Sequence, residues 1–387
     1  MDASRGANLQ SPSTWIRIRS IAGRILFAVG VPLLVFYVLY VGFIFLRDSD
    51  APRGITALVA IVWGVGGVAL LFWLFNGIVE RLPDALRTRL LPFVFVGPAV
   101  AILSWYLTLP TLRTFWLSLF GRGGPQAGLG FFQLLASESF VGLQNYAAVF
   151  TEQLMLQSFR NNLMWIVFGS TFSVVLGLLI AVLADRSSYE RVAKSLIFLP
   201  LAISFVGAGI IWNFIYEYRP AGQDQIGLLN AIVTSFGVTP QAWPQWVKIV
   251  PWNNLFLIVI VIWLQAGFAM VLFSAAIKGV PEELMEAGRI DGANEIQIFF
   301  RIMLPYIQGT LISVWTTIII FTLKIFDVVW VMTGGQFGTH VIATQFYRQS
   351  FTNRNSGFGS AIAIVLLLAV VPVMIYNLKR FGEQEAF

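Results

Sequence analysis

The chain has 387 residues, of which 57% are hydrophobic and only 11% are charged. Because soluble domains carry about 25% charged residues, this composition excludes an ordinary soluble protein and indicates an integral membrane protein. Cysteine is absent and His340 is the single histidine. Disulfides and a histidine-rich metal site are therefore excluded, and we expect neither a metal site nor catalytic residues in this chain.

A run of about 20 apolar residues can cross a bilayer as an α-helix. Eight such runs occur, so we predict an all-α polytopic membrane protein with eight transmembrane helices. The runs cover residues 25–46, 55–79, 91–112, 162–184, 196–216, 254–276, 306–328 and 358–378. The first lacks a small-residue cleavage site followed by a soluble domain, so we expect it to be retained and not removed as a signal peptide.

The first part of the chain is predicted to be an addition to a core domain. Residues 1–24 form a cytoplasmic tail, residues 25–89 an additional two-helix hairpin, and residues 90–387 a core with six helices. The apolar run of the third span continues beyond Pro110, and 30 helical residues would reach about 45 Å. This exceeds the ~30 Å hydrocarbon core, so we expect a break or an outward projection near Pro110. An ordinary proline kink is the simpler interpretation.

The positive charges predict the orientation of these spans. With a cytoplasmic N-terminus, fifteen Lys and Arg residues fall in cytoplasmic segments and eight on the other side, which includes residues 121–161, 217–253 and 329–357. Lys and Arg are enriched in cytoplasmic loops, so we expect both termini and the loop at 278–305 to face the cytoplasm. The formal net charge of +6 then follows from topology, and no nucleic-acid partner is needed to explain it.

The loop at 278–305, called the docking loop below, is the one long charged interruption between apolar spans. Seven charges fall between Glu282 and Arg301, so this segment cannot lie in hydrocarbon. Gly292 indicates a sharp turn between two short helices, and Pro305 is predicted to restart a helix that enters the membrane. The second short helix is predicted to carry an apolar stripe formed by Ile296, Phe299, Phe300 and Met303.

The spacing of this loop resembles the EAA loop of ABC importer permeases. The resemblance implies contact with an ATPase and a coupling role for Glu286, Ala287, Gly288, Asp291, Gly292, Ile302, Leu304 and Pro305. Gly288 stands where that family usually has alanine, and glycine costs about 1 kcal/mol in a helix relative to alanine. The alternative is an amphipathic hairpin that lies on the lipid headgroups or packs beneath its own bundle.

The resemblance extends over roughly residues 90–380 and is closest to sugar permeases of the maltose and α-glucoside class. It rests on the segment 140–146, on Gly227-Leu228-Leu229-Asn230 and on Thr333-Gly334-Gly335. It implies the type I ABC importer permease fold in a bacterial or archaeal plasma (inner) membrane. The implied partners are a second permease subunit, two ATPase subunits, an extracytoplasmic solute-binding protein and membrane lipid. The chain has no phosphate-binding loop motif, so ATP and Mg²⁺ are expected on the partner subunits.

Candidate residues of the substrate path lie near the ends of two spans. Lys324 and Asp327 are three residues apart on the predicted helix. They could form a salt bridge on one helix face or give the substrate path a polar lining, and the sequence leaves both interpretations open. The sugar site of the family draws partly on this helix. The resemblance therefore implies lining roles there and on the fifth span, for Phe321, Thr322, Lys324, Trp212, Asn213 and Tyr216. Aromatic residues at span ends are also common interfacial anchors.

These patterns together predict a permease subunit that translocates a carbohydrate, an α-glucoside or another oligosaccharide, by alternating access in an ATP-driven importer. One alternative is an ABC permease for a polyol, glycerol phosphate or an amino acid, because related permeases share the docking loop. A self-sufficient secondary transporter or channel would need ion-coupling charges in the membrane or an inverted repeat. The chain offers one candidate charged pair and no convincing repeat.

Overall fold

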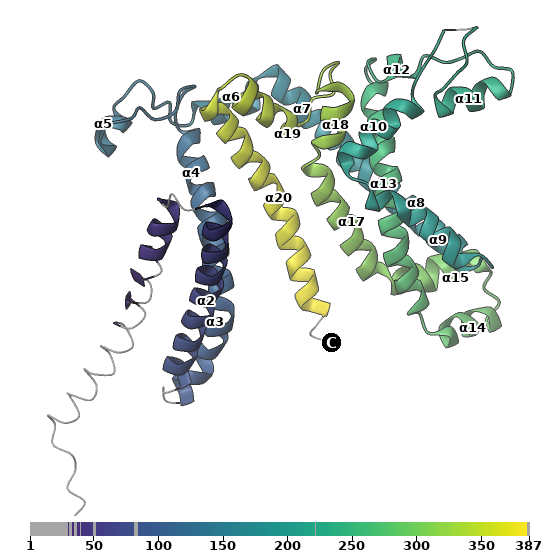
Figure 1. The fold of residues 1–387 in the computed structure, drawn as a ribbon. Helices are drawn as coiled ribbons and strands as arrows, with labels where there is room; N and C mark the ends of the chain where they lie inside the picture. Colours follow the sequence, from purple (N-terminus) through teal and green to yellow (C-terminus); the bar gives the residue numbers. More distant parts are fainter. Residues whose placement is uncertain are drawn as a thin grey trace, which may run out of the picture. The chain divides into compact units, whose positions relative to one another are not determined.

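The computed structural model describes residues 30, 33–34, 37–38, 40–48, 52–80, 84–220 and 222–384, and most of them are helical. The chain divides into two compact units, Met1–Pro110 and Thr111–Phe387. Figure 1 shows that the described residues of both units are built from helices and connecting loops. The expected tail at 1–24 lies outside the described residues, and the division expected near residue 90 stays a prediction.

The first unit contains two long helices that pack against each other. They are α2, Arg53–Glu80, and α3, Asp84–Leu103, and the rings of Phe72 and Phe95 meet edge to face with centroids 5.2 Å apart. Only 6% of the apolar window of α2 is buried. An apolar helix with so exposed a surface suits hydrocarbon on its outer faces. Before α2, the described residues 40–47 are also helical, at the end of the first predicted span.

The backbone irregularity expected near Pro110 lies one turn earlier. A π-helical segment, η1, covers Ser104–Thr108, and the next helix, α4, covers Leu109–Ser118. The helical residues run without interruption from residue 84 to residue 118, so Pro110 lies inside a helical run and not at its start. The chain does not break at this proline. The π-helical segment just before it agrees with the simpler interpretation, an ordinary irregularity of a proline-containing helix.

The second unit contains the remaining helices. They are α5 Phe131–Leu135, α6 Gln144–Thr151, α7 Gln153–Met164, η2 Trp165–Ser170, α8 Thr171–Asp185, α9 Glu190–Phe198, η3 Leu199–Ala202, α10 Phe205–Ile215, α11 Leu228–Ser235, α12 Trp243–Trp246, α13 Trp252–Lys278, α14 Glu282–Ile290, α15 Glu295–Ile298, η4 Phe299–Met303, α16 Leu304–Tyr306, α17 Gln308–Leu323, α18 Asp327–Thr333, α19 Ile342–Tyr347, η5 Arg348–Thr352 and α20 Ser356–Gln384. The η segments are π-helical, except for η3, which is a 3₁₀ helix.

Helix α13 is the centre of this unit. It is apolar on all sides, which is typical of a helix buried within a bundle, and 56% of its apolar window is buried. Small residues allow α8 to approach it closely. A Cβ added at Gly177 of α8 would lie 2.4 Å from the Cβ of Ala269 of α13. A larger residue at Gly177 would therefore force these two helices apart.

Four helical segments of the described chain are long and apolar enough to cross a membrane, or up to six if each of two bent pairs is one span. The four are Arg53–Glu80, Gln153–Asp185, Trp252–Lys278 and Ser356–Lys379. The bent pairs are Glu190–Ala202 with Phe205–Ile215, at 107°, and Glu295–Tyr306 with Gln308–Leu323, at 71°. A multi-pass membrane protein is thus confirmed, whereas the count of eight is not. Much of the first predicted span lies outside the described residues.

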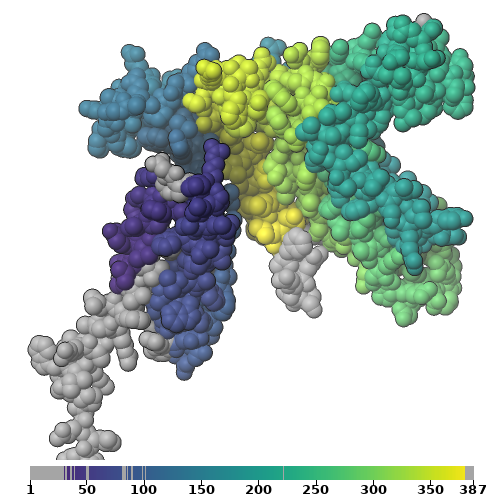
Figure 2. Space-filling model, viewed as in Figure 1, coloured from purple at the N-terminus to yellow at the C-terminus, as the bar shows by residue number. Residues whose placement is uncertain are grey.

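The two kinds of loop in the second unit lie at opposite ends. The docking loop, with α14 and α15, is at one end, and α6, α12, α18 and α19 of the predicted external segments are at the other (Figure 1). The space-filling view shows the same separation, with the docking loop at the lower right tip (Figure 2). The docking loop and the predicted external segments therefore lie on different faces of this unit.

Candidate functional site

The turn of the docking loop has the geometry that the sequence predicts. Gly292 has a φ of +84°, a left-handed conformation that glycine adopts without a steric penalty. Its N–H donates to the carbonyl of Arg289 at 3.1 Å, and the N–H of Ala293 donates to the carbonyl of Gly288 at 2.9 Å. These two bonds form a Schellman motif that ends α14. Asp291 is the C-cap residue of the same helix.

The second helix begins at a capping box that the sequence reasoning missed. The Asn294 side chain accepts a bond from the N–H of Gln297 at 2.9 Å, and the Gln297 side chain accepts one from the N–H of Asn294 at 2.8 Å. The pattern of Asn followed three residues later by Gln is a known start signal for a helix. The two short helices are therefore held at a fixed turn by caps on both sides.

The predicted apolar stripe on this second helix was only partly correct, because Phe299 and Met303 pack in the core and the other two members face outward. Ile296 and Phe300 are exposed by 70% and 60%, whereas Ile298 and Met303 are buried. The reason is the π-helical segment η4, Phe299–Met303, because its wider turn changes which residues share a face. The spacing of five between the two buried residues fits this wider turn.

Gly288 allows α14 to lie directly on the second helix. It is buried, and an added Cβ would lie 2.7 Å from Cδ1 of Ile302 and 3.6 Å from Cγ1 of Ile298. The fold thus brings together two of the predicted coupling residues, Gly288 and Ile302. Pro305 does not restart a helix, because helical residues run from Glu295 to Tyr306 and the 71° bend follows them.

The docking loop presents an exposed surface of mixed character. Leu284 is 45% exposed and Ile290 is 85% exposed, and Ala287 and Glu286 between them are also exposed. Large apolar side chains in water are unfavourable. Exposed apolar residues on a charged loop that cannot enter hydrocarbon suit contact with a protein partner.

Five of the seven predicted substrate-path residues line two separate cavities. One has a volume of about 300 Å³ and is called the Lys248 cavity; its lining comprises Asn213, Tyr216, Glu217, Pro244, Val247, Lys248, Met332, Thr333 and Phe337. The other has a volume of about 260 Å³ and is called the Lys324 cavity; its lining comprises Phe205, Phe321, Lys324, Ile325, Phe326 and Asp327. The sequence did not indicate Glu217, Lys248 or Thr333, since they lie outside the predicted spans or motifs of the path.

The three candidates on α10 and just after it differ in their surroundings. Asn213 is exposed and lines the Lys248 cavity. Tyr216 presents its ring to this cavity, while its hydroxyl donates to the carbonyl of Phe256 at 2.9 Å. Trp212 is not in the lining. Its ring lies between Tyr216 and Trp263, with centroids at 5.1 Å and 5.9 Å, and its buried Nε1 has no hydrogen-bond partner.

Lys324 and Asp327 do not share a helix face, so that prediction was wrong. Helix α17 ends at Leu323 and α18 begins at Asp327, so the two residues flank a break, and no ion pair joins them among the described residues. Both still line the Lys324 cavity, together with Phe321. Thr322 is fully buried and donates to the carbonyl of Ile318 at 3.0 Å, so its hydroxyl serves the helix.

Two neighbouring asparagines of α7 hold this break in place. The Asn162 amide donates to the carbonyl of Leu323 at 3.0 Å and accepts from the N–H of Ile342 at 2.8 Å. The Asn161 amide donates to the carbonyls of Gly338 and His340 at 2.7 Å and 2.8 Å. Carbonyls at a helix end have no partner within the helix. Side chains of α7 therefore replace the bonds that a continuous span would have made.

His340 is buried next to this break and serves the fold. Its Nε2 accepts from Nη1 of Arg348 at 3.1 Å, and its Nδ1 lies 3.3 Å from Oγ1 of Thr344. Burial, and then the nearby Arg348 charge, lower the pKa of His340 to about 4. No group of His, Cys, Asp and Glu that could hold a metal ion occurs in the part of the chain that the structure describes.

Comparisons with known proteins agree with these features. Residues 173–381 match the family model described as the binding-protein-dependent transport system inner membrane component. The osmoprotective compounds uptake permease protein GgtC of Synechocystis sp. is 54% identical over 76% of this chain and 99% of that protein. The α-glucoside transport system permease protein AglF of Rhizobium meliloti is 44% identical over 86% of this chain and 98% of that protein.

A solved structure shows the same fold. It is a bacterial alginate ABC transporter in complex with a periplasmic protein that binds an alginate pentasaccharide. The likeness has a TM-score of 0.62 at 18% sequence identity, over 77% of this chain and 96% of that chain. This supports the predicted type I ABC importer permease fold. The chain belongs to the family of binding-protein-dependent transport system inner membrane components, and it is a multi-pass permease subunit and not an enzyme.

Proposed function

We propose that this chain translocates a carbohydrate, such as an α-glucoside or a related osmoprotective compound, in an ATP-driven importer. The observation that carries the proposal is the identity of 54% and 44% with permeases for osmoprotective compounds and α-glucosides, each over at least three quarters of this chain. The sequence did not predict similarity to a permease for osmoprotective compounds. That similarity adds osmoprotective compounds to the α-glucosides and oligosaccharides predicted as substrates.

The cavities support a sugar-like substrate. The Lys248 cavity combines the ring of Tyr216 with the amide of Asn213 and the hydroxyl of Thr333. Sugars present apolar faces ringed by hydroxyl groups, so an aromatic ring beside polar donors and acceptors suits them. In our proposal Asn213 and Tyr216 line one part of the path, and Phe321, Lys324 and Asp327 line another. Trp212 and Thr322 do not line the path but pack behind the residues that do.

The docking loop is proposed to contact one of two ATPase subunits, which hold ATP and Mg²⁺. Its rigid turn at Gly292 and its exposed residues Leu284, Glu286 and Ile290 support this role. The proposal includes a second permease subunit and an extracytoplasmic binding protein as partners. It also includes eight spans, a cytoplasmic position of both termini, and the added hairpin at 25–89.

The test is a substrate panel on the assembled transporter in proteoliposomes. We expect ATP hydrolysis to be stimulated by trehalose, maltose or sucrose presented with the binding protein, and not by glycerol, glycerol phosphate or glutamine. If only a non-sugar stimulates ATP hydrolysis, the chain belongs to a transporter for another class of solute. Transport by this chain alone, without ATPase subunits, would replace the proposal with a secondary transporter.

The coupling role has its own test. Glu286→Lys reverses an exposed charge, so we expect it to leave the protein inserted but to weaken its contact with the ATPase and uncouple hydrolysis from transport. Glu138→Lys, in the predicted external segment 121–161, is a matched control on another exposed carboxylate. Normal coupling in the Glu286 variant would contradict the role of this residue.

A further inference from the structure

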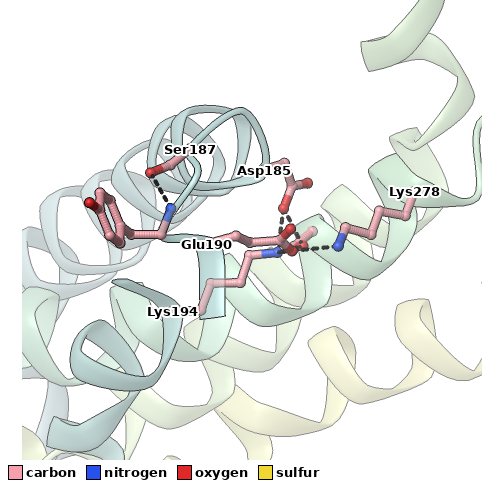
Figure 3. Close-up of polar contacts among 7 residues, drawn as sticks. Asp185, Ser187, Glu190, Lys194 and Lys278 are labelled. Atoms are coloured by element: carbon pink, nitrogen blue, oxygen red, sulfur yellow. Dashed lines mark hydrogen bonds and ion pairs between the residues drawn. The ribbon is translucent and has the colours of Figure 1, made fainter. Parts of the chain in front are cut away.

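A cluster of polar side chains joins three helices at the end of the second unit that carries the docking loop. Asp185 is the last residue of α8, Glu190 and Lys194 lie on α9, and Ser274 and Lys278 lie on α13. Figure 3 shows the carboxylates and ammonium groups of the cluster pointing toward one another. The basic residues of the cluster entered only the prediction of topology, and the proposed function leaves the cluster unexplained.

Lys194 is the centre of the cluster. Its Nζ donates to Oε1 of Glu190 at 2.5 Å, to Oδ1 of Asp185 and to Oγ of Ser274. An ammonium group has three hydrogens, so its donors are fully used by three residues of three helices. The Ser274 hydroxyl in turn donates to Oδ1 of Asp185 at 2.7 Å, and Nζ of Lys278 donates to Glu190.

The central ion pair of this cluster is partly buried. The side chains of Lys194 and Asp185 are only 18% and 12% exposed, and Oδ2 of Asp185 is buried without a hydrogen-bond partner. Replacing a buried ion pair by apolar residues is often neutral or stabilising, because desolvation offsets the attraction. Stability alone therefore does not account for an ion pair at this position. What the ions add is one fixed geometry.

The cluster is bonded to the docking loop through the adjacent residue. Arg186 follows Asp185, and its Nη2 contacts Oε2 of Glu295 at 2.8 Å. Glu295 is the first residue of α15, and its Oε1 contacts Nε of Arg289 on α14 at 3.0 Å. Such exposed pairs stabilise a fold little. They nevertheless attach both docking helices to the turn between α8 and α9.

Helix α9, which carries two residues of the cluster, leads directly into α10. Near the end of α9, a Cβ added at Gly267 of α13 would lie 2.4 Å from the carbonyl oxygen of Ile197, so the backbone of α9 lies directly on α13. The chain then bends by 107° into α10. Farther along, Gly209 of α10 faces Val331 of α18, where an added Cβ would lie 2.9 Å from Cγ1. Helix α10 therefore follows α9 through the bend and packs against α18.

Helix α10 borders both cavities of the candidate substrate path. Its first residue, Phe205, lines the Lys324 cavity, and the Phe205 and Phe321 rings lie 5.3 Å apart. Near its end, Asn213 lines the Lys248 cavity. A rotation of α10 about the bend would therefore change both cavities at once.

We propose that Lys194 is a positioning residue that makes α9 move with α8, α13 and the docking loop, so that docking-loop movement turns α10 and reshapes the two cavities. The proposal rests on the coupling role of the docking loop proposed above. Coupling between two distant sites has a physical basis where one element has two arrangements and both sites bias them. The bend between α9 and α10 is that element.

The experiment compares variants of the assembled transporter in proteoliposomes, with the sugar of the panel that stimulates hydrolysis most. For Lys194→Met we expect the amount of sugar transported per ATP to fall by about 5-fold or more, the lower end of typical coupling. Hydrolysis without sugar should stay near the level of the native protein. Lys194→Arg should restore coupling, because it keeps a charged donor. Arg191→Gln, which changes an exposed cation of the same helix, is the matched control and should change nothing.

A second variant separates positioning from folding. Lys194→Met leaves the Asp185 carboxylate buried and unpaired, which destabilises a protein. The double variant Asp185→Asn with Lys194→Met removes both charges and is expected to fold and to remain uncoupled. Native coupling in the double variant would overturn the proposal. Failure of both variants to assemble would also overturn it, by assigning the cluster to folding.

A reference variant separates this inference from the proposed function. Gly292→Pro alters the docking loop itself. If it transports sugar normally, the docking role fails and the inference falls with it. If it uncouples the transporter while Lys194→Met does not, only the inference about Lys194 fails.

Discussion

The turn at Gly292 gives a graded test of the docking loop. With a φ of +84°, any L-residue other than glycine pays a steric cost of roughly 1–2 kcal/mol, with asparagine the most tolerant. Proline cannot adopt this conformation at all, because its ring fixes φ near −65°. It also removes the bond from the Gly292 N–H to the carbonyl of Arg289, worth about 0.5–1.5 kcal/mol.

These magnitudes predict an ordered series. Gly292→Asn should retain most coupling, Gly292→Ala should lose part of it, and Gly292→Pro should abolish the fixed turn and with it the coupling of hydrolysis to transport. The turn is exposed, and an added Cβ at Gly292 would meet nothing within 4 Å. The amount of inserted protein should therefore stay unchanged in the whole series.

The assay measures ATP hydrolysis and sugar transport on the same proteoliposomes, with the bound ATPase quantified after purification. Gly128→Pro is the matched control, because Gly128 has a φ of +86° and equally open surroundings in the predicted external segment 121–161. The reasoning is refuted if the proline variant at Gly292 couples normally, or if the control uncouples to the same degree.

Three other predictions concern Gly288, the substrate path and His340. Gly288→Ala should be tolerated, because the clash falls on the flexible end of Ile302 and alanine gains about 1 kcal/mol of helix propensity. Gly288→Leu should separate the docking helices and uncouple transport. Asn213→Ala should raise the KM for sugar by about 2- to 12-fold, the equivalent of one hydrogen bond. Thr322→Val should leave this KM unchanged, because the Thr322 hydroxyl bonds to a carbonyl of its own helix. If the Asn213→Ala and Thr322→Val variants have equal KM values for sugar, Asn213 does not line the path. Because the folded pKa of His340 is about 4, below the unfolded value of about 6.5, the unfolded state binds the extra proton between these values. Stability should therefore fall by on the order of 3 kcal/mol as the pH drops from about 6.5 to 4. Thermal unfolding in detergent, measured as a function of pH, should show this loss. A His340→Gln variant with the same pH dependence of stability would contradict the prediction.

The sequence by itself determined the features that depend on local composition and backbone conformation. Apolar runs predict spans because hydrocarbon accepts apolar side chains, and those over 55–79 and 254–276 coincide with long helices. Seven charges predict that the docking loop leaves the membrane. Glycine at position 292 predicts a left-handed turn, because that requirement lies within one residue.

The tertiary structure alone decided where the spans break and which residues meet. The helix after the docking loop ends at Leu323 because its carbonyl bonds to Asn162, 161 residues earlier in the chain, and no local pattern reports such a partner. The same holds for Lys194, which bonds to Ser274. Helix propensity and hydropathy describe neighbours in the sequence, whereas buried polar groups are satisfied by whichever atoms the packing brings within reach.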